Sequence, residues 1–328
     1  MSWFRRKPRA PALDVGREKE HAWAEAAHEL KQLRVSTAAG LERLQASSAQ
    51  APAKSGWDKA TVIIQAAGAL AIIIPLIALF VSINQFSEQQ KANAAATLEQ
   101  QRINAAAALD QQRQATLSGY LDDMSVLVLQ YNLTKSAPGA PVRAIAVART
   151  LTAVRDLDGA RKATLIRYLW EAGLLARPQP IVNIHGADLT GSVFSKADLD
   201  GIALFQIFLN SAQFINNTSL VNADLSGSYL YEADLATANL SHADLQDSLP
   251  VAANFAGAIL AGADLAGADL TGDDLAGARL AGADLKGALY NAKPEYVYDP
   301  QGRLVLEKPT RWPPGVDPRA EGATCYGC

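Results

Sequence analysis

Three sets of side chains in this sequence are of types that carry out chemistry in proteins. Aspartates recur at intervals of five residues between residues 181 and 292, and two carboxyl groups can act together as a general acid and a general base. Cys325 and Cys328 form a CxxC motif, which is the spacing of thiol–disulfide exchange sites. His21 and His28 lie seven residues apart on a predicted helix, and imidazole carries protons and binds metals.

None of these sets is predicted to be an active site. The carboxylates recur at one structural position, so pairing any two as acid and base would be arbitrary. The sequence has no phosphate-binding loop, GxSxG or HExxH motif, and its two cysteines and four histidines lack the spacing of a zinc site. The histidines are expected on the surface. We therefore expect a protein that is not an enzyme and has neither a cofactor nor a metal.

The two cysteines favour a different interpretation from redox catalysis. The motif lies at the terminus and begins no helix, unlike a thioredoxin-type site. Outside the cytoplasm, Cys325 and Cys328 are expected to oxidise to a local or an intermolecular disulfide.

An uncharged stretch, residues 60–87, predicts a single transmembrane helix. Its core, Thr61–Ile83, has 23 residues. As a helix this core would be about 34 Å long, enough to cross the ~30 Å apolar layer of a bilayer. Trp57 lies just before the stretch, where an interfacial ring is expected. We therefore expect the lipid bilayer to be one partner of this chain.

The basic residues around this stretch predict its orientation. Residues 1–59, a basic region that is partly helical or disordered, hold eleven Lys and Arg. Residues 84–115 hold three. The more basic side normally stays in the cytoplasm, which favours a cytoplasmic N-terminus and a C-terminal part on the outer side.

Residues 88–115 predict a helical stalk with an eleven-residue period. Its two copies, ANAAATLEQQR and INAAAALDQQR, are identical at eight of eleven positions. Eleven residues make about three helical turns, so each motif returns to the same face. Leu98, Ile103 and Leu109 form only a narrow apolar seam. Both a lone stalk and a coiled coil that joins copies into a homo-oligomer therefore remain open.

Residues 116–180 predict a small helical connector. A glycine- and proline-containing segment, SAPGAP, separates its first two helices. The second helix is expected from Val142 to about Leu157, and Asp158 is a suitable N-cap for the third. The apolar stripe of the third helix consists of Leu165, Ile166, Leu169 and Trp170.

Residues 181–292 carry a large apolar residue at every fifth position. The 22 units have Ala two places before that residue in 14 cases and Asp or Asn one place before it in 12 cases. One extra residue within Asn216–Ser219 shifts the phase and predicts a bulge. Neither a helix nor a strand has this period, whereas a solenoid of stacked short units can have it.

The A-(D/N)-L-x-x pattern resembles that of the pentapeptide-repeat family over residues 181–292. The helical connector, and the stretch YDPQGR…TRWPPGVDP in the tail (residues 293–328), also resemble the flanks of bacterial membrane-anchored members. The resemblance implies a right-handed quadrilateral β-helix with four units per coil. The expected fold class is thus a mainly β solenoid, preceded by α-helical segments and one transmembrane helix.

In such a coil the Leu and Ala positions would face the axis, because side chains alternate along an extended chain. The Asp or Asn between them would point outwards and could bond turn amides. In this register one core ladder contains Leu189, Leu209, Leu230 and Leu270.

Departures from the pattern mark a candidate partner surface. Counting four units per coil places Phe208, Tyr229 and Leu249 on one face, which Asp269 interrupts before Leu289. An outward apolar strip predicts contact with an unknown protein partner, and burial under the connector or the tail is the alternative. The candidate contact residues are Phe205, Phe208, Tyr229 and Leu249.

The charge of the repeats supports a second hypothesis. Residues 181–292 hold 13 acidic and 3 basic residues, a net charge of −10, whereas the whole chain is nearly balanced with 33 acidic and 30 basic residues. No direct binding of nucleic acid is therefore expected. The resemblance includes soluble acidic rods that mimic DNA and bind a type II topoisomerase. The predicted span and orientation favour instead a non-enzymatic, membrane-anchored interaction or scaffold module.

Overall fold

The computed structural model describes residues 56–299 and 301–326, with the backbone alone at residues 56–75, 77, 295–298, 304 and 307. The chain divides into two compact units, residues 1–95 and residues 96–328. Helix α2 (Gly56–Leu129) contributes residues to both units. It runs without a break through the predicted boundaries at residues 88 and 116, since residues 76–118 contain neither glycine nor proline.

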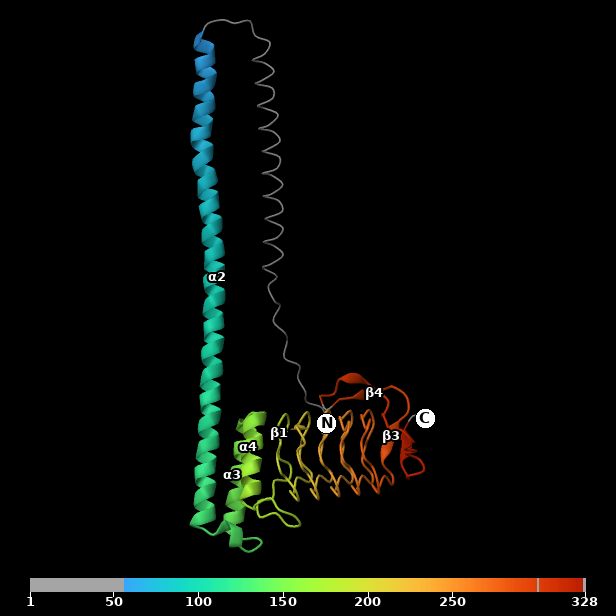
Figure 1. The fold of residues 1–328 in the computed structure, drawn as a ribbon. Coiled ribbons are helices and arrows are strands. Elements are labelled where there is room, and N and C mark those ends of the chain that lie inside the picture. Colours follow the sequence, from blue (N-terminus) through green and yellow to red (C-terminus); the bar gives the residue numbers. More distant parts are fainter. Residues whose placement is uncertain (1–55, 300, 327–328) are drawn as a thin grey trace, which may run out of the picture. The chain divides into compact units, whose positions relative to one another are not determined.

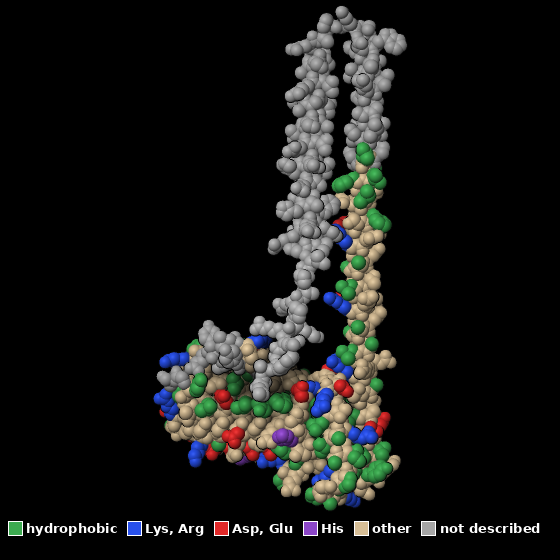
Figure 2. Space-filling view, turned by 180° about the vertical axis from the view of Figure 1, so that it is seen from behind, with side chains coloured by type: hydrophobic (Ala, Val, Ile, Leu, Met, Phe, Trp, Pro, Cys, Tyr) green, Lys and Arg blue, Asp and Glu red, His purple; other side chains and the backbone are tan. Residues whose placement is uncertain are grey.

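The first unit exposes large apolar side chains on α2. Six of them are between 45% and 66% exposed: Leu76, Leu79, Phe80, Val81, Ile83 and Phe86. Figure 2 shows apolar side chains gathered on this part of the helix. Within the residues that the structure describes, no helix is both long enough and apolar enough to cross a membrane.

Most of the predicted membrane span has no described side chains, because residues 60–75 and 77 are described by their backbone alone. Residues 1–55, which include most of the predicted basic region and both His21 and His28, lie outside the described residues. The transmembrane helix and its orientation therefore remain predictions.

The connector consists of the end of α2, the short 3₁₀ helix η1 (Leu133–Lys135), α3 (Pro141–Asp156) and α4 (Gly159–Glu171). The hydroxyls of Tyr120 and Thr150 lie 2.8 Å apart and join α2 to α3, and burial raises the pKa of Tyr120. Asp158 is the N-cap of α4 and accepts a 3.0 Å hydrogen bond from Arg161 N–H, as its position in the sequence indicates.

Helix α4 covers the first coil of the repeats. Leu165, Ile166 and Leu169 are fully buried and belong to one continuous core with the first coils. Lys162, on the same helix, is 6% exposed, and its Nζ lies 3.7 Å from Asp188 Oδ1 in the first coil. The apolar stripe of α4 therefore closes the end of the solenoid at which the first coil lies. In Figure 1 the coils continue from α4 and β1 towards β3.

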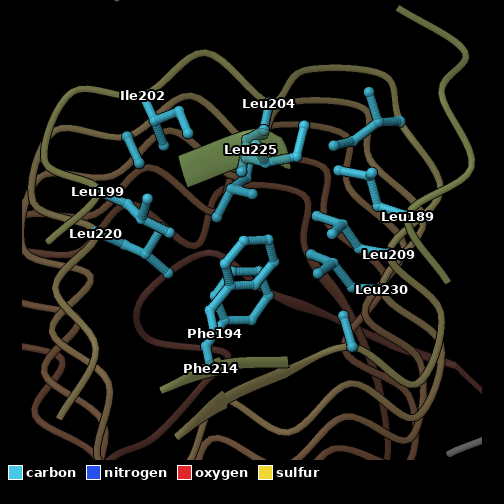
Figure 3. Packing of buried hydrophobic residues seen from close by; sticks show 14 of the residues in the cluster. Leu189, Phe194, Leu199, Ile202, Leu204, Leu209, Phe214, Leu220, Leu225 and Leu230 are labelled. Carbon is cyan, nitrogen blue, oxygen red and sulfur yellow. The ribbon is translucent and has the colours of Figure 1, made fainter. Parts of the chain in front are cut away.

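The repeats stack as coils of four units. Parallel bridges join positions 20 residues apart, as in Asp224↔Asp244 and Asp244↔Asp264. In Figure 3 the large apolar side chains point inwards from four walls: Leu189, Leu209 and Leu230 from one, Leu199 and Leu220 from another, Leu204 and Leu225 from a third, and Phe194 and Phe214 from the fourth. The predicted ladder residues Leu189, Leu209, Leu230 and Leu270 are all 0% exposed.

The extra residue lies where the sequence places it. Bridges that cross it join positions 21 residues apart, as in Asp198↔Ser219. Asn216 and Asn217 adopt consecutive left-handed conformations, with φ of 57° and 63°. Thr218 then fills the inward position usually held by Ala, and its hydroxyl donates to the carbonyls of Phe194 (3.0 Å) and Ile215 (2.8 Å).

Pro250 interrupts one ladder. The bridge Tyr229↔Leu249 forms in the preceding coil, but in the described part of the chain no bridge joins Leu249 to Asp269. The reason is chemical, because the proline has no N–H to donate to the next coil. The hydrogen bond in the opposite direction between these two coils, from Asp269 N–H to Ser248 O, is present at 3.0 Å.

The tail caps part of the last coil. Strands β1 (Val193–Ser195) and β2 (Gln213–Ile215) pair within the repeats, whereas β3 (Leu289–Asn291) pairs in parallel with β6 (Thr324–Tyr326) near the C-terminus. Between them, β4 (Glu295–Tyr298) and β5 (Leu304–Glu307) form an antiparallel hairpin. Two faces of the last coil are thus extended by tail residues.

We expect Thr237→Gly to stabilise the solenoid. Thr237 occupies a corner with φ of 61°, a conformation that is unfavourable for a β-branched residue and that Gly257 fills one coil later with φ of 69°. The gain should be about 0.5–1 kcal/mol in the free energy of unfolding, measured by denaturant titration. The same change at Thr218, which lies inside the core, should lower the free energy of unfolding.

Candidate interaction surface

The residues Phe208, Tyr229 and Leu249 form a continuous apolar strip along one face of the solenoid. Parallel bridges join Phe208 to Tyr229 and Tyr229 to Leu249, so the three side chains occupy the same position in successive coils. They are 38%, 42% and 37% exposed, so the described residues of the connector and the tail leave them accessible. The rings of Phe208 and Tyr229 stack with centroids 4.8 Å apart. The strip therefore presents a preformed aromatic pair to a partner.

Charged residues bound the strip. Asp188 precedes Phe208 on this face and is held by Lys162, while Asp269 follows Leu249 and separates it from Leu289. Burial acts to raise the pKa of Asp188, but the Thr190 hydroxyl, the Thr190 N–H and the Lys162 ammonium together hold it below its usual value. Figure 2 shows apolar side chains gathered in a band on one side of the domain.

Phe205 does not belong to the apolar strip. It follows the buried Leu204 at a corner of the coil and is itself half-buried. The face position in that coil is Phe208, three residues later. The sequence identifies both phenylalanines as departures from the repeat, but only the coil register separates them.

The outward Asp and Asn side chains have a structural role. At all 12 positions where Asp or Asn precedes the central residue, its Oδ1 accepts a hydrogen bond from the N–H two residues later, as in Asp264 to Ala266 N–H at 3.0 Å. These bonds satisfy a corner amide that no strand ladder could reach. The periodic carboxylates thus hold the turns of the coil.

Four of these carboxylates form an acidic ladder on another face: Asp224, Asp244, Asp264 and Asp284. Burial raises the pKa of Asp244 above its usual value, and the charges of Asp224 and Asp264 raise it further, against the lowering by Gln246 N–H and Arg177. Arg177 Nη2 lies 3.6 Å from Asp244 Oδ2, so one guanidinium partly neutralises the ladder.

Asp273 departs from the repeat pattern, and the pattern alone does not explain its role. It takes the inward position usually held by Ala and is fully buried. Its Oδ1 accepts a 2.8 Å hydrogen bond from Ala253 N–H, and its carbonyl accepts one from Arg311 N–H of the tail at 2.9 Å. The signal in the sequence is the doubled aspartate of TGDDL, where other units have Ala-Asp-Leu.

Cys325 lies on the edge of the last coil. Cys325 is in β6, opposite Tyr290, and is disulfide-bonded. Cys328 lies outside the described residues.

Comparison with known proteins identifies the repeats. A sequence model described as pentapeptide repeats, in eight copies, matches residues 215–248 and 251–288. None of the curated proteins matches the chain.

Solved structures with similarity include HetL, a pentapeptide repeat protein involved in heterocyst differentiation regulation from the cyanobacterium Nostoc sp. strain PCC 7120. It is 27% identical over 37% of this chain and 55% of its own, with a TM-score of 0.29. A pentapeptide repeat protein of the Arabidopsis thaliana thylakoid lumen is 26% identical over 34% of this chain and 68% of its own, with a TM-score of 0.18. QnrB1, a plasmid-mediated fluoroquinolone resistance protein, is 17% identical over 44% of this chain and 79% of its own, with a TM-score of 0.31.

These TM-scores are too low to support an argument from the three structures, and the alignment with HetL spans about half of that protein. The identification rests on the matched repeats and on the coils of stacked five-residue units. This chain therefore carries a domain of the pentapeptide-repeat family, whose repeats imply a right-handed β-helix.

Proposed function

We propose that this chain is a non-enzymatic, membrane-anchored interaction module that binds a partner protein through the apolar strip. The observation that carries the proposal is the exposed run of Phe208, Tyr229 and Leu249 in successive coils. Most positions of this kind elsewhere in the solenoid hold Asp or Asn. Exposed apolar side chains that are contiguous and rimmed by charge are typical of protein-binding surfaces.

The role of the carboxylates supports a function without catalysis. Each outward Asp that precedes a central residue accepts a turn amide through Oδ1, so its recurrence at this position is explained by the fold. The repeated acidic residues are therefore interpreted as parts of the scaffold.

The proposed anchor is the uncharged stretch of residues 60–87. Its length matches a bilayer, and the described side chains at its end, such as Leu79 and Ile83, are 56% and 58% exposed. The basic residues before it favour a cytoplasmic N-terminus, with the repeats on the outer side. Protease added to intact cells should then remove the repeat domain, and full protection of the C-terminus would reverse the orientation.

The stalk supports self-association as a further part of this proposal. Leu98 and Leu109 lie one eleven-residue period apart and are 53% and 45% exposed on α2. A second copy of the helix could cover them in a right-handed coiled coil. Cross-linking of full-length chains through cysteines placed at residue 98 would detect the pairing.

We expect the apolar strip to be needed for binding and not for folding. A photo-cross-linking residue at position 229, introduced into the full chain in its native membrane, should yield a covalent adduct with a protein. The double change of Phe208→Ser and Tyr229→Ser should leave the melting temperature nearly unchanged, because both side chains are already about 40% exposed. An adduct formed from position 249 should disappear in this double variant.

Val193 supplies the matched control. It is 37% exposed, as is Leu249, but it lies on a different face, in the ladder of β1 and β2. A cross-linker at position 193 should yield no adduct, and Val193→Ser should leave the adduct from position 249 intact. Equal adducts from positions 193 and 229, or unfolding of the double variant, would rule out the proposed surface.

The acidic ladder favours a second candidate function. Asp224, Asp244, Asp264 and Asp284 repeat at the spacing of the coils, about 4.8 Å. A regular row of negative charge could imitate a nucleic-acid backbone and bind a type II topoisomerase. The purified chain would then inhibit DNA supercoiling by gyrase, and Asp224→Asn with Asp264→Asn would weaken the inhibition. No inhibition at any concentration would exclude this function.

A further inference from the structure

The last coil of the solenoid shows how an added strand is held. On one face, Arg311 of the tail lies beside Asp274, with bonds from Leu275 N–H to Arg311 O (2.8 Å) and from Arg311 N–H to Asp273 O (2.9 Å). Arg311 Nη1 also lies 2.5 Å from Asp274 Oδ2. A strand that extends the coil is therefore recognised by its backbone and by an opposite charge at the outward position.

The next face of the same coil carries no such strand. Its edge, Ala278–Gly282, which we term the open edge, follows Asp274 by one unit. In the preceding coil, the equivalent edge makes three bonds: Arg279 N–H to Ala258 O (2.9 Å), Leu260 N–H to Arg279 O (2.8 Å) and Gly262 N–H to Ala281 O (2.9 Å). The same three groups one coil later are Ala278 O, Leu280 N–H and Gly282 N–H. None of them has a partner of this kind within the part of the chain that the structure describes.

The open edge is accessible. Gly282 and Arg279 are exposed and Leu280 is partly exposed, whereas almost every other central residue of the solenoid is fully buried. The open edge thus presents Ala278 O, Leu280 N–H and Gly282 N–H beside the partly exposed side chain of Leu280. The equivalent backbone groups are paired in every preceding coil. An extended segment could complete all three bonds and cover the leucine at once.

The charge at this edge has the opposite sign from the rest of the solenoid. Of the three basic residues in residues 181–292, two are in the last coil, Arg279 and Lys286. With Asp284 they give residues 276–287 of this coil a net charge of +1, whereas the equivalent residues one coil earlier, 256–267, carry −1. Arg279 forms no ion pair with the residues that the structure describes.

We propose that the open edge binds an extended segment of a partner protein in which an acidic residue is followed by an apolar one. The acidic side chain stands beside Arg279, as Arg311 stands beside Asp274 on the neighbouring face. The apolar side chain faces the axis and covers Leu280. This surface is separate from the apolar strip, so neither depends on the other.

A second copy of this chain fits the edge less well. Pairing two open edges brings Arg279 of both copies into one interface, and residues 278–282 contain no acidic residue to offset them, which is repulsive. Stacking the edge on the first coil of another copy is blocked, because α4 covers that coil through Leu165, Ile166 and Leu169. The positive charge of Arg279 and the cover of the first coil by α4 therefore both favour a different protein with an acidic segment as the partner.

Leu280→Pro tests the backbone part of the proposal. Proline removes the Leu280 N–H, which donates no backbone hydrogen bond to any residue that the structure describes, and Pro250 shows that a central position of the coil accepts proline. Short random peptides displayed on phage and selected on the full chain should converge on Asp or Glu followed by an apolar residue. Leu280→Pro should weaken the best synthetic peptide about tenfold, the effect of one lost hydrogen bond.

Charge reversal tests the side-chain part. Selection on Arg279→Glu should converge on Lys or Arg at the position where the native chain selects acids. Lys196→Glu, which alters the third basic residue of the repeats, should leave the native selection unchanged, and so should Phe208→Ser with Tyr229→Ser. In hydrogen exchange, bound peptide should protect the amides of Leu280 and Gly282.

Three results would overturn the proposal. The selection could give no enrichment over an unrelated bait, the enriched peptides could bind Leu280→Pro as tightly as the native chain, or the Arg279→Glu selection could still yield acids. Self-association that Leu280→Pro abolishes would instead identify a second copy as the occupant. Loss of binding at the apolar strip would leave all these measurements unaffected, so the two surfaces are tested separately.

Discussion

Gly159→Ala should detach α4 from the repeats and lower the free energy of unfolding by about 3 kcal/mol or more. Gly159 is the first residue of α4, and an added Cβ would lie 1.9 Å from the carbonyl oxygen of Gly191 and 2.6 Å from its carbonyl carbon. Both are backbone atoms of the first coil, so no side-chain rotation relieves the overlap. The helix must move away, which draws Lys162 from Asp188 and opens the core beneath Leu165. Denaturant titration and hydrogen exchange of the first coil would measure the effect.

The same substitution at Gly119 is the matched control. Gly119 lies inside α2, and a Cβ added there meets nothing within 4 Å. Alanine is favoured over glycine inside a helix, so Gly119→Ala should raise the free energy of unfolding by about 0.5–1 kcal/mol. If glycine-to-alanine lowers the free energy of unfolding at residue 159 and raises it at residue 119, the loss at Gly159 comes from its contact with Gly191. A loss below about 1 kcal/mol at Gly159 would show that α4 does not need this close approach.

The solenoid could be predicted from the sequence because its pattern is local. Five-residue units, the inward Leu and Ala, and the outward Asp or Asn each depend on neighbours a few residues away, as the bond from Asp264 to Ala266 N–H shows. The phase shift near Asn216 and the break at Pro250 could be located for the same reason. The face shared by Phe208 and Tyr229 followed from counting units once four per coil was assumed.

Contacts between distant segments could not be predicted in this way. Arg311 pairs with Asp274, 37 residues earlier, and no period relates the two. In the sequence, Gly159 is an ordinary residue after an N-cap. Only the structure shows that it lies against the backbone of Gly191. Phe205 is as apolar as Phe208, and only the position of the corner turns one partly inwards and the other outwards. The removal of Phe205 from the candidate surface therefore needed the structure of the coil, whereas the open edge needed the path of the tail.

Asn291→Leu should release the tail from the last coil at a cost of about 3 kcal/mol or more. Asn291 is 1% exposed, and its Oδ1 accepts from Gly272 N–H (2.9 Å), Thr310 N–H (3.0 Å) and Thr310 Oγ1 (2.9 Å). Its Nδ2 donates to the carbonyls of Lys293 and Lys308, both at 3.0 Å. One amide thus joins the repeats to both ends of the β4–β5 hairpin. Leucine has a similar volume but leaves Gly272 N–H and the carbonyls of Lys293 and Lys308 without this partner, whereas Thr310 keeps its bonds to the carbonyls of Asn291 and Leu270.

Hydrogen exchange followed by mass spectrometry would detect this release. Amides of β3 to β6 should exchange much faster in Asn291→Leu, while central coils such as residues 224–265 keep their protection, because each coil of a solenoid contacts only its neighbours. Asn239→Ala is the control, since Asn239 Oδ1 accepts from one turn residue, Ser241, through its N–H (3.2 Å) and its hydroxyl (2.7 Å), and should cost about 1 kcal/mol or less. Unchanged exchange in β6 would show that β3 alone holds the tail. Release of the tail also frees the edges beside Asp274 and Leu289, so the variant should self-associate through these strand edges, in addition to any pairing of the stalk.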